Sequence, residues 1–290
     1  MTGPAQAVLP DGRLHLQHGP IDLVIDARGA ASDVERAQRK AWQRFQDILT
    51  TLVAELALLR TPVGDAYPLA RGPLARRMVA ACWPHRSRFI TPMAAVAGSV
   101  ADEMLAAMLA GCSLQSAYVN DGGDIAIWVA PGEWLDAGIV SHPLRPKLDA
   151  TLRLDRPCGL ATSGWRGRSH SLGIADAVTV LAADAAAADA AATLLANAVD
   201  FDHPAIRRVP ARELRHDSDL GELPVTVAVG ELPASCVAEA LERGARAARA
   251  MQQAGLIQAA YVALQGQTRV AAPLARAGCD KLLVMRGSVC

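Results

Sequence analysis

Residues 116–129 read SAYVNDGGDIAIWV, a pattern that predicts an antiparallel hairpin and organises the segments around it. Two β-like runs, Ser116–Val119 and Ile125–Val129, flank a polar turn with paired glycines. Glycine adopts positive φ without strain and allows close approach to the backbone. Taken alone, this is the chemistry of an ordinary hairpin turn. A turn that faces a polar ligand has the same composition, and that second interpretation depends on other segments.

Helical periodicity surrounds this hairpin. Apolar residues recur at helical spacing behind Ser32–Glu35, which has capping-box spacing, so one long amphipathic helix is predicted from about Asp33 to Arg60. Further helices are predicted at residues 74–82, 98–110, 185–198 and 233–253.

Strand signals occupy much of the remaining chain. They predict a hairpin at residues 12–28 and strands at 177–182, 224–229, 261–265 and 282–285. Residues 141–158 are expected to form loops with an edge strand, and residues 202–222 a charged loop. Hairpins mixed with helices predict an α+β fold rather than parallel βα alternation. We expect one domain over residues 1–290, with two intertwined subdomains and a loop-rich boundary near 141–158 as the alternative.

Composition excludes several classes of function. The 290 residues are 51% hydrophobic, and 29 Lys+Arg balance 29 Asp+Glu. A neutral chain with only 4% aromatic residues argues against nucleic-acid binding. The apolar stretch Ala182–Val199 is interrupted by Asp184 and Asp189, so no membrane partner is expected. Six scattered cysteines without a C-x-x-C pair, and no signal-peptide pattern, favour a cytoplasmic protein.

The small residues within Thr91–Gly98 lead into the helix predicted at 98–110, which contains Asp102. Amides at a helix N-terminus favour an anionic group such as a pyrophosphate. Tight packing between helices explains the same small side chains.

The segment 160–173 concentrates hydroxyls, glycines, Arg166, Arg168 and His170. Hydroxyls and backbone amides suit phosphate oxygens, and arginines add charge-assisted contacts. Histidine suits acid–base chemistry because its reference pKa lies near neutrality. A solvent-exposed loop with a packing histidine is the equally weighted alternative.

A third segment places oxygen atoms along one helix face. Asp189, Thr193 and Asn197 lie at positions i, i+4 and i+8 of the predicted helix 185–198. Oxygen ligands suit a hard cation such as Mg²⁺. A solvated helix face is the alternative.

Taken in order, these segments resemble the ApbE superfamily, whose best-known members are FAD:protein FMN transferases. The resemblance is carried by a small-residue helix start with Gly98 and Asp102, then Asn-x-Gly-Gly-Asp-Ile, Thr-Ser-Gly and Ala-Asp-x-x-x-Thr. Residues 91–98, 170–172 and 175–180 are similar to a branch of uncharacterised ApbE-like proteins. The resemblance implies an ApbE-like α+β fold with mixed or antiparallel sheets flanked by helices.

The resemblance also implies bound FAD and Mg²⁺. The cofactor-binding residues that it implies are Asn120, Gly122, Gly123, Asp124, Thr162, Ser163, Gly164 and Asp102. The implied metal ligands are Asp189 and Thr193. For an enzyme, we assign proton handling to His170 or Asp176 as catalytic residues.

The chain departs from the transferases at two places. Ala97 stands where they have lysine before the glycine, and their His-x-x-Asp-Pro-x-Thr-Gly stretch is reduced at residues 170–176. These departures favour a retained nucleotide pocket over retained FMN transfer.

Three hypotheses follow. The first is an enzyme that cleaves a phosphoester or pyrophosphate, or transfers flavin, with an acceptor protein as partner. The second is a non-catalytic flavin-binding module. The third is a cofactor-biosynthesis enzyme that acts on another substrate in the same pocket. Exposed alanine-rich faces are compatible with a homodimer, and the sequence leaves the oligomeric state open.

Overall fold

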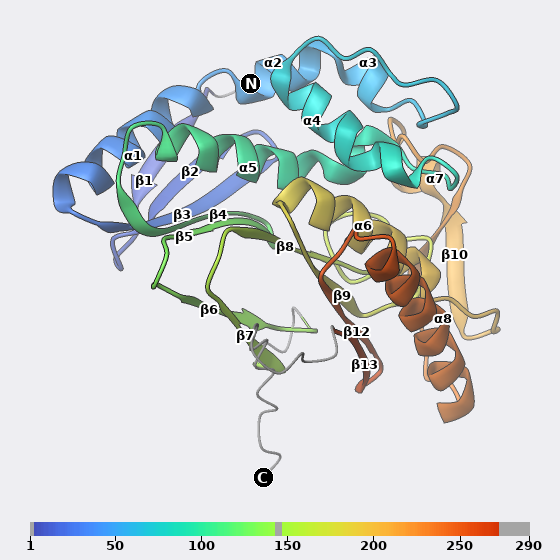
Figure 1. Cartoon of the computed structure of the whole chain (residues 1–290). Helices are drawn as coiled ribbons and strands as arrows, with labels where there is room; N and C mark the ends of the chain where they lie inside the picture. Colours follow the sequence, from blue (N-terminus) through green and yellow to red (C-terminus); the bar gives the residue numbers. More distant parts are fainter. Residues whose placement is uncertain (1–2, 143–146, 273–290) are drawn as a thin grey trace. The chain divides into compact units, whose positions relative to one another are not determined.

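The computed structural model describes residues 3–142 and 147–272 (Figure 1). The chain divides into two compact units, and its successive stretches alternate between them. The first unit contains the chain up to residue 135 together with residues 154–161 and 182–190. The second contains residues 136–153, 162–181 and the chain from residue 191.

An antiparallel sheet organises the first unit, with neighbouring strands in the order β1, β2, β3, β4, β5 and β8. Their bounds are Ala5–Val8, Leu14–His18, Ile21–Gly29, Leu114–Asp121, Asp124–Val129 and Cys158–Ser163. Helices α1 (Ala31–Phe45) and α5 (Val96–Leu109) lie on one face of this sheet (Figure 1). The antiparallel hairpins with covering helices confirm the predicted α+β class.

Side-chain alternation explains how this sheet buries one face. Leu23 and Ile25 of β3 are fully buried, two residues apart, as a half-buried strand requires. Phe45 of α1 and Met104 and Met108 of α5 are also fully buried in the same apolar core. Helix α4 (Pro73–Cys82), close to its predicted bounds, packs against α5.

The single long helix predicted for residues 33–60 is wrong. Residues 31–59 instead form three helices: α1, α2 (Ile48–Ala54) and α3 (Leu56–Leu59). Asp47 and Glu55 interrupt them with φ near −117°. The Glu55 carboxylate accepts hydrogen bonds from the amides of Arg71 and Gly72, each at 2.7 Å. Apolar periodicity cannot reveal such a tertiary contact.

The predicted capping box does not form either. Helix α1 begins at Ala31, and its N-cap residue Ala30 provides no side-chain hydrogen bond. The carboxylate of Asp33 instead pairs with Arg36 inside the first turns.

The second unit contains three groups of strands. Strands β9 (Ala177–Ala182), β12 (Ala259–Leu264) and β13 (Gln267–Ala271) pair antiparallel in that order. Two-stranded sheets are formed by β6 (Leu135–Ile139) with β7 (Ala150–Leu154), and by β10 (Ile206–Pro210) with β11 (Pro224–Val229). The predicted charged loop at 202–222 therefore contains β10 and the short helix α7 (Ala211–Leu214). The strand predicted at 282–285 lies outside the described residues.

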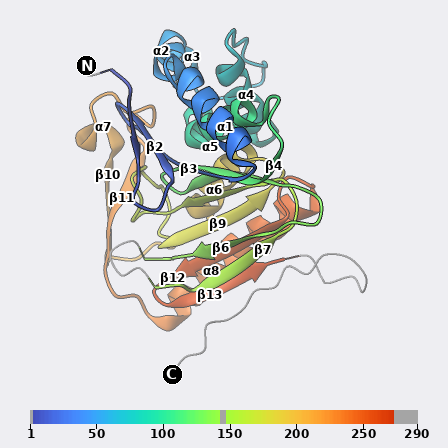
Figure 2. The same ribbon diagram turned by 90° about the vertical axis from the view of Figure 1, so that its left-hand side faces the viewer.

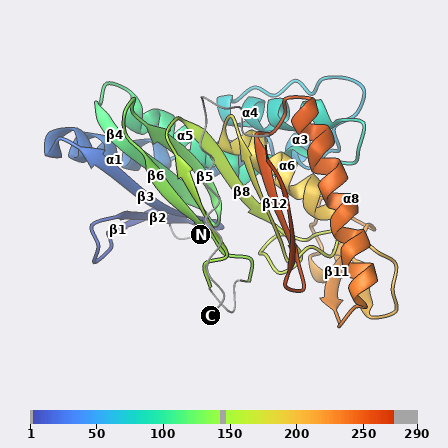
Figure 3. The same cartoon turned by 60° about the horizontal axis from the view of Figure 1, so that its bottom comes forward.

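Two longer helices complete the described chain. Helix α8 (Ala234–Gln253) lies alongside β12 and β13 (Figure 3). Helix α6 (Ala185–Ala198) has its predicted bounds, and it passes from the first unit into the second after residue 190.

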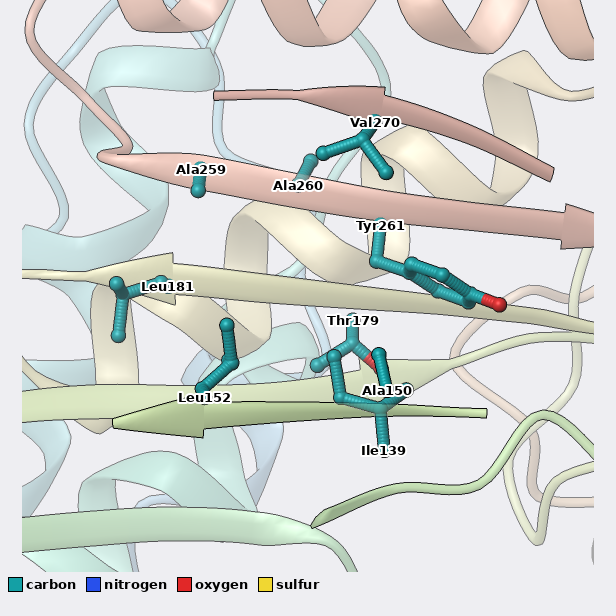
Figure 4. A pocket seen from close by; sticks show the side chains of 9 residues that line it. All are labelled: Ile139, Ala150, Leu152, Thr179, Leu181, Ala259, Ala260, Tyr261 and Val270. Atoms are coloured by element: carbon teal, nitrogen blue, oxygen red, sulfur yellow. The ribbon is translucent and has the colours of Figure 1, made fainter. Parts of the chain in front are cut away.

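Strands β6 and β7 lie beside β12 and β13 in the second unit (Figure 2). An apolar hollow lies between β6 and β7 on one side and β9, β12 and β13 on the other (Figure 4). Its lining residues are Ile139, Ala150, Leu152, Thr179, Leu181, Ala259, Ala260, Tyr261 and Val270. None of these side chains carries a charge at neutral pH, so the hollow does not suit a phosphate-bearing ligand.

The stretch Pro92–Leu109, which includes α5, has a mean hydropathy of 1.3 over 18 residues. By length and composition alone it could cross a membrane. The same composition suits a core helix, and α5 buries Val100, Met104, Leu105 and Met108 within the first unit.

Candidate functional site

The Gly122-Gly123 turn joins β4 to β5 as a two-residue hairpin loop, with Asp121 opposite Asp124. Gly122 and Gly123 have φ of 66° and 116°, which explains the need for glycine. The Asn120 side-chain oxygen accepts a hydrogen bond from the Gly123 amide at 2.8 Å. A Cβ on Gly123 would meet no atom within 4 Å. The predicted hairpin is confirmed, and its turn has an open side.

The start of α5 packs tightly against the start of α6. A Cβ on Gly98 would lie only 2.2 Å from the carbonyl oxygen of Ala185. The Gly98 amide donates to the Asp189 carboxylate at 3.0 Å. Tight helix packing is therefore confirmed at Gly98, and this N-terminal amide already has an anion supplied by the protein.

Asp102 makes the reciprocal contact. Its two carboxylate oxygens accept hydrogen bonds from the amides of Ala185 and Ala186, at 3.0 and 2.9 Å. Each helix thus supplies an aspartate to the N-terminus of the other, where backbone amides lack intrahelical partners. Burial raises the Asp102 pKa to about 6, and nearby Asp184 adds to this shift.

Asp189 lies in a region of negative charge. Its pKa is raised well above the ordinary value, first by burial and then by the charge of Asp124, with Asp121 adding to the effect. Hydrogen bonds from the amides of Gly98 and Ala97 act in the opposite direction. The turn and the start of α6 therefore bring carboxylates close enough to repel one another.

The fit of this region to a divalent cation depends on its donor atoms. Within the described ranges, no group of three or more His, Cys, Asp or Glu side chains could hold a metal. Mg²⁺ often takes only one or two protein carboxylates and completes its shell with phosphates and water. The carboxylates around Asp189 fit that mode. Thr193 is half-buried one turn further along α6.

In the second unit, the Thr162–Gly164 segment is held against β9 and the residue before it. The hydroxyls of Thr162 and Thr179 lie 2.9 Å apart in a hydrogen bond, and Ser163 is half-buried. Gly164 has φ of 155°, and a Cβ there would lie 2.6 Å from the Asp176 carbonyl oxygen. This predicted binding segment therefore has a fixed backbone path.

The Asp176 carboxylate accepts three hydrogen bonds in this region. One carboxylate oxygen accepts from the Arg166 Nε at 2.7 Å and the Trp165 indole at 3.2 Å. The other accepts from the Gln265 amide at 2.6 Å. The predicted catalytic carboxylate is thus occupied by three protein donors. The tryptophan and glutamine partners carry no sequence signal that would have predicted this role.

The predicted catalytic His170 stands apart from this network. Its ring is half-buried and, within residues 3–142 and 147–272, makes no hydrogen bond or ion pair. The next residues are anchored, because the Asn197 side-chain oxygen accepts from the Ser171 hydroxyl at 3.2 Å and the Leu172 amide at 2.9 Å. Asn197 of the predicted polar stripe therefore fixes this segment and is not merely solvated.

The sequence matches the family described as AbpE bacteria over residues 6–270. A UPF0280 protein of Methanothrix thermoacetophila is 39% identical over 137 residues, covering 45% of this chain and 54% of the relative. A UPF0280 protein of Archaeoglobus fulgidus is 36% identical over 161 residues, covering 53% and 66%. The chain spans about half the length of the first of these curated relatives.

Two solved structures are similar in fold to this chain over most of its length. The ApbE protein of Thermotoga maritima has a TM-score of 0.48 and 12% identity, covering 92% of this chain and 96% of its own. The flavin transferase ApbE from Vibrio cholerae has a TM-score of 0.46 and 12% identity, covering 93% and 97%.

Proposed function

The chain belongs to the ApbE-like family described as AbpE bacteria, and from this membership we propose that it binds a flavin nucleotide with Mg²⁺. FAD is the first candidate, and a related phosphate-bearing ligand is the second. The proposed reaction is cleavage of a phosphoester or pyrophosphate bond, or transfer of flavin to an acceptor protein. A cytoplasmic location and a homodimer remain predictions.

One observation carries the proposal: the Asp189 carboxylate lies at the start of α5 and is repelled by Asp124 and Asp121. Divalent charge relieves such repulsion, so the donor set fits Mg²⁺ with Asp189 as a ligand and Thr193 as a candidate hydroxyl ligand. When bound, Mg²⁺ would neutralise pyrophosphate charge and polarise the bond to be cleaved.

Two segments are proposed, each within its own unit, to face a nucleotide: the Gly122-Gly123 turn in the first unit and the Thr162–Gly164 segment in the second. The open side of Gly123 supports close approach of a ligand to the backbone. The hydroxyls and amides of residues 162–164 suit phosphate oxygens.

His170 is the better candidate for proton transfer. Its ring has no protein partner among the described residues, whereas both oxygens of Asp176 are occupied. Asp176 is better suited to holding its neighbours in place.

A non-catalytic flavin-binding module is the second candidate function. The occupied Asp176 and the alanine at position 97 favour it, because both reduce the groups available for chemistry. A cofactor-biosynthesis enzyme acting on a different substrate is the third candidate.

Flavin binding and turnover separate these candidates. The purified protein is titrated with FAD while flavin fluorescence is recorded, and AMP release is then followed with Mg²⁺, with and without candidate acceptor proteins. AMP release supports the enzyme, whereas FAD binding without turnover supports the binding module. A protein that neither binds nor cleaves FAD would exclude both.

The metal assignment has its own test. Asp189→Ala is expected to abolish Mg²⁺-dependent turnover and to weaken Mg²⁺ binding at least about tenfold, because a charged ligand is lost. Asp155→Ala is the matched control, since Asp155 is exposed and pairs only with neighbouring Arg156 among the described residues. Equal Mg²⁺ affinity in both variants would show that Asp189 is not a ligand.

A further inference from the structure

Arg166 is held at the tip of a tight turn in the second unit. The turn closes through a hydrogen bond from the Gly167 amide to the Gly164 carbonyl at 3.0 Å. A second bond, from the Trp165 amide to the Ala175 carbonyl at 3.0 Å, fixes the turn against the neighbouring chain. The side chain of Arg166 is 27% exposed, so part of it still reaches solvent.

Two contacts restrain the guanidinium group. Its Nε donates to Asp176 at 2.7 Å, and its central carbon lies 4.3 Å from the centre of the Trp165 ring. Asp176 is itself fixed by the Trp165 indole and the Gln265 amide. Arginine normally loses considerable rotamer entropy when it binds a ligand, and here much of that freedom is lost on folding.

The restrained group retains donors for a ligand. Arginine has five N–H donors, of which Nε supplies one. Neither terminal nitrogen of Arg166 donates a hydrogen bond to the described residues. A fixed, planar pair of donors matches two oxygens of a phosphate group.

We propose that Arg166 binds a phosphate or pyrophosphate group, and that Asp176 and Trp165 are the positioning residues that orient it. The ligand class is a nucleotide or another organic phosphate. This inference rests on the proposed function, because it assigns a phosphate-recognising residue next to the proposed Thr162–Gly164 segment of the same unit. It gives Asp176 a role that needs no proton transfer.

A purely structural ion pair between Arg166 and Asp176 is the competing explanation. Such a pair would stabilise the loop whatever ligand binds. Loss of Arg166 would then affect ligands with and without phosphate equally. A phosphate-binding role predicts a loss confined to ligands that carry phosphate.

Isothermal titration with three probes distinguishes these roles: inorganic pyrophosphate, FMN and riboflavin. Arg166→Gln is expected to weaken pyrophosphate and FMN binding at least about tenfold and to leave riboflavin binding unchanged. Arg166→Lys should recover part of the loss, since lysine keeps the charge without the planar fork. Asp176→Asn should weaken the same two ligands less than Arg166→Gln does.

Arg243→Gln is the matched control. Arg243 also lies in the second unit, pairs with Glu239 at 2.7 Å and lies 5.5 Å from the centre of the Phe201 ring. The Arg243→Gln variant should bind all three probes with the affinity of the wild type. Thermal melting checks that each variant is folded. If Arg166→Gln does not fold, Arg166→Lys replaces it in the titrations.

Equal losses for FMN and riboflavin would overturn the assignment, as would equal effects of Arg166→Gln and Arg243→Gln. A wild-type protein that binds neither pyrophosphate nor FMN more tightly than riboflavin would also overturn it. If the wild type binds pyrophosphate but no flavin, the proposed flavin function fails. Selective loss of pyrophosphate binding in Arg166→Gln would then still support the phosphate-binding role.

Discussion

At the scale of single residues, the contact between the starts of α5 and α6 depends on the absence of one side chain. Gly98 allows the Ala185 carbonyl to approach so closely that no Cβ fits. The approach also brings Asp102 and Asp189 onto the helix N-termini. One glycine and two carboxylates therefore form a single packing arrangement.

Gly98→Ala is expected to destabilise the protein by at least about 2 kcal/mol, because the new methyl group would overlap backbone atoms that cannot rotate away. Gly64→Ala is the control, since its Cβ would meet nothing within 4 Å and it should change stability by less than about 0.5 kcal/mol. Urea unfolding measures both. Similar midpoints for the two variants would contradict the packing described.

The Asp102 carboxyl makes the stability of the folded protein depend on pH. Its pKa of about 6 in the folded state lies above its ordinary value of 3.8, so the folded state binds more protons between these values. The stability from this group is present at low pH and is lost as pH rises from about 4 to about 6.

Asp102→Asn should remove that dependence, so the stability of the wild type relative to the variant is expected to fall across this range. The slope cannot exceed about 1.4 kcal/mol per pH unit for one proton. Urea unfolding of both proteins at several pH values provides the measurement. Parallel pH profiles would show that the Asp102 pKa is not raised.

At the scale of elements, the β4–β5 hairpin requires glycines in its turn, and one side of that turn is open. Positive φ at both turn positions explains the glycines without any ligand. Ligand binding must therefore be tested by a change that preserves the turn. Asparagine accepts left-handed backbone better than other residues with side chains, and Gly122 has φ of 66°.

Gly122→Asn is expected to change stability by less than about 1 kcal/mol and to weaken FAD binding at least about tenfold, because a side chain would obstruct the ligand. Thermal melting and FAD titration give the two results. Unchanged FAD affinity in a folded variant would remove the turn from the proposed site.

At the scale of the whole molecule, the chain alternates between the two units, so neither unit corresponds to one continuous segment. The first unit needs residues 154–161, of which 158–160 pair with β5, and residues 182–190, whose amides at Ala185 and Ala186 donate to Asp102 of α5. Folding of this unit therefore requires chain synthesised much later than its core strands.

A fragment of residues 1–135 should fail to fold stably, because Asp102 would lose its amide partners and β5 would lose its pairing with β8. The amide region of a ¹H–¹⁵N correlation spectrum is expected to be narrow for the fragment and dispersed for the full chain. A well-dispersed fragment spectrum would show that the early segment suffices.

Local patterns predicted much of this fold. The hairpin at 116–129 and helices α4, α5, α6 and α8 follow from periodicity, turn glycines and alanine content, which act over a few residues. The helix break at Glu55 has no local signal, because the partners that stabilise it, Arg71 and Gly72, are distant in sequence. The local patterns do not predict β1, β6, β8, β10 or β13. Strands β1 and β13 are short edge strands, which carry weak patterns, whereas β8 is paired on both sides and lies partly in a segment interpreted as a loop.

Residue types and motif order by themselves determined which positions are candidates for chemistry, since phosphate and Mg²⁺ binding require hydroxyls, carboxylates and glycines. Only the tertiary structure decided how those side chains are engaged. Asp102 and Asp189 cap each other's helices, Asp176 holds Arg166, and His170 stays without a described partner. Hydrogen bonds between residues tens of positions apart depend on how the chain packs, and no local pattern encodes them.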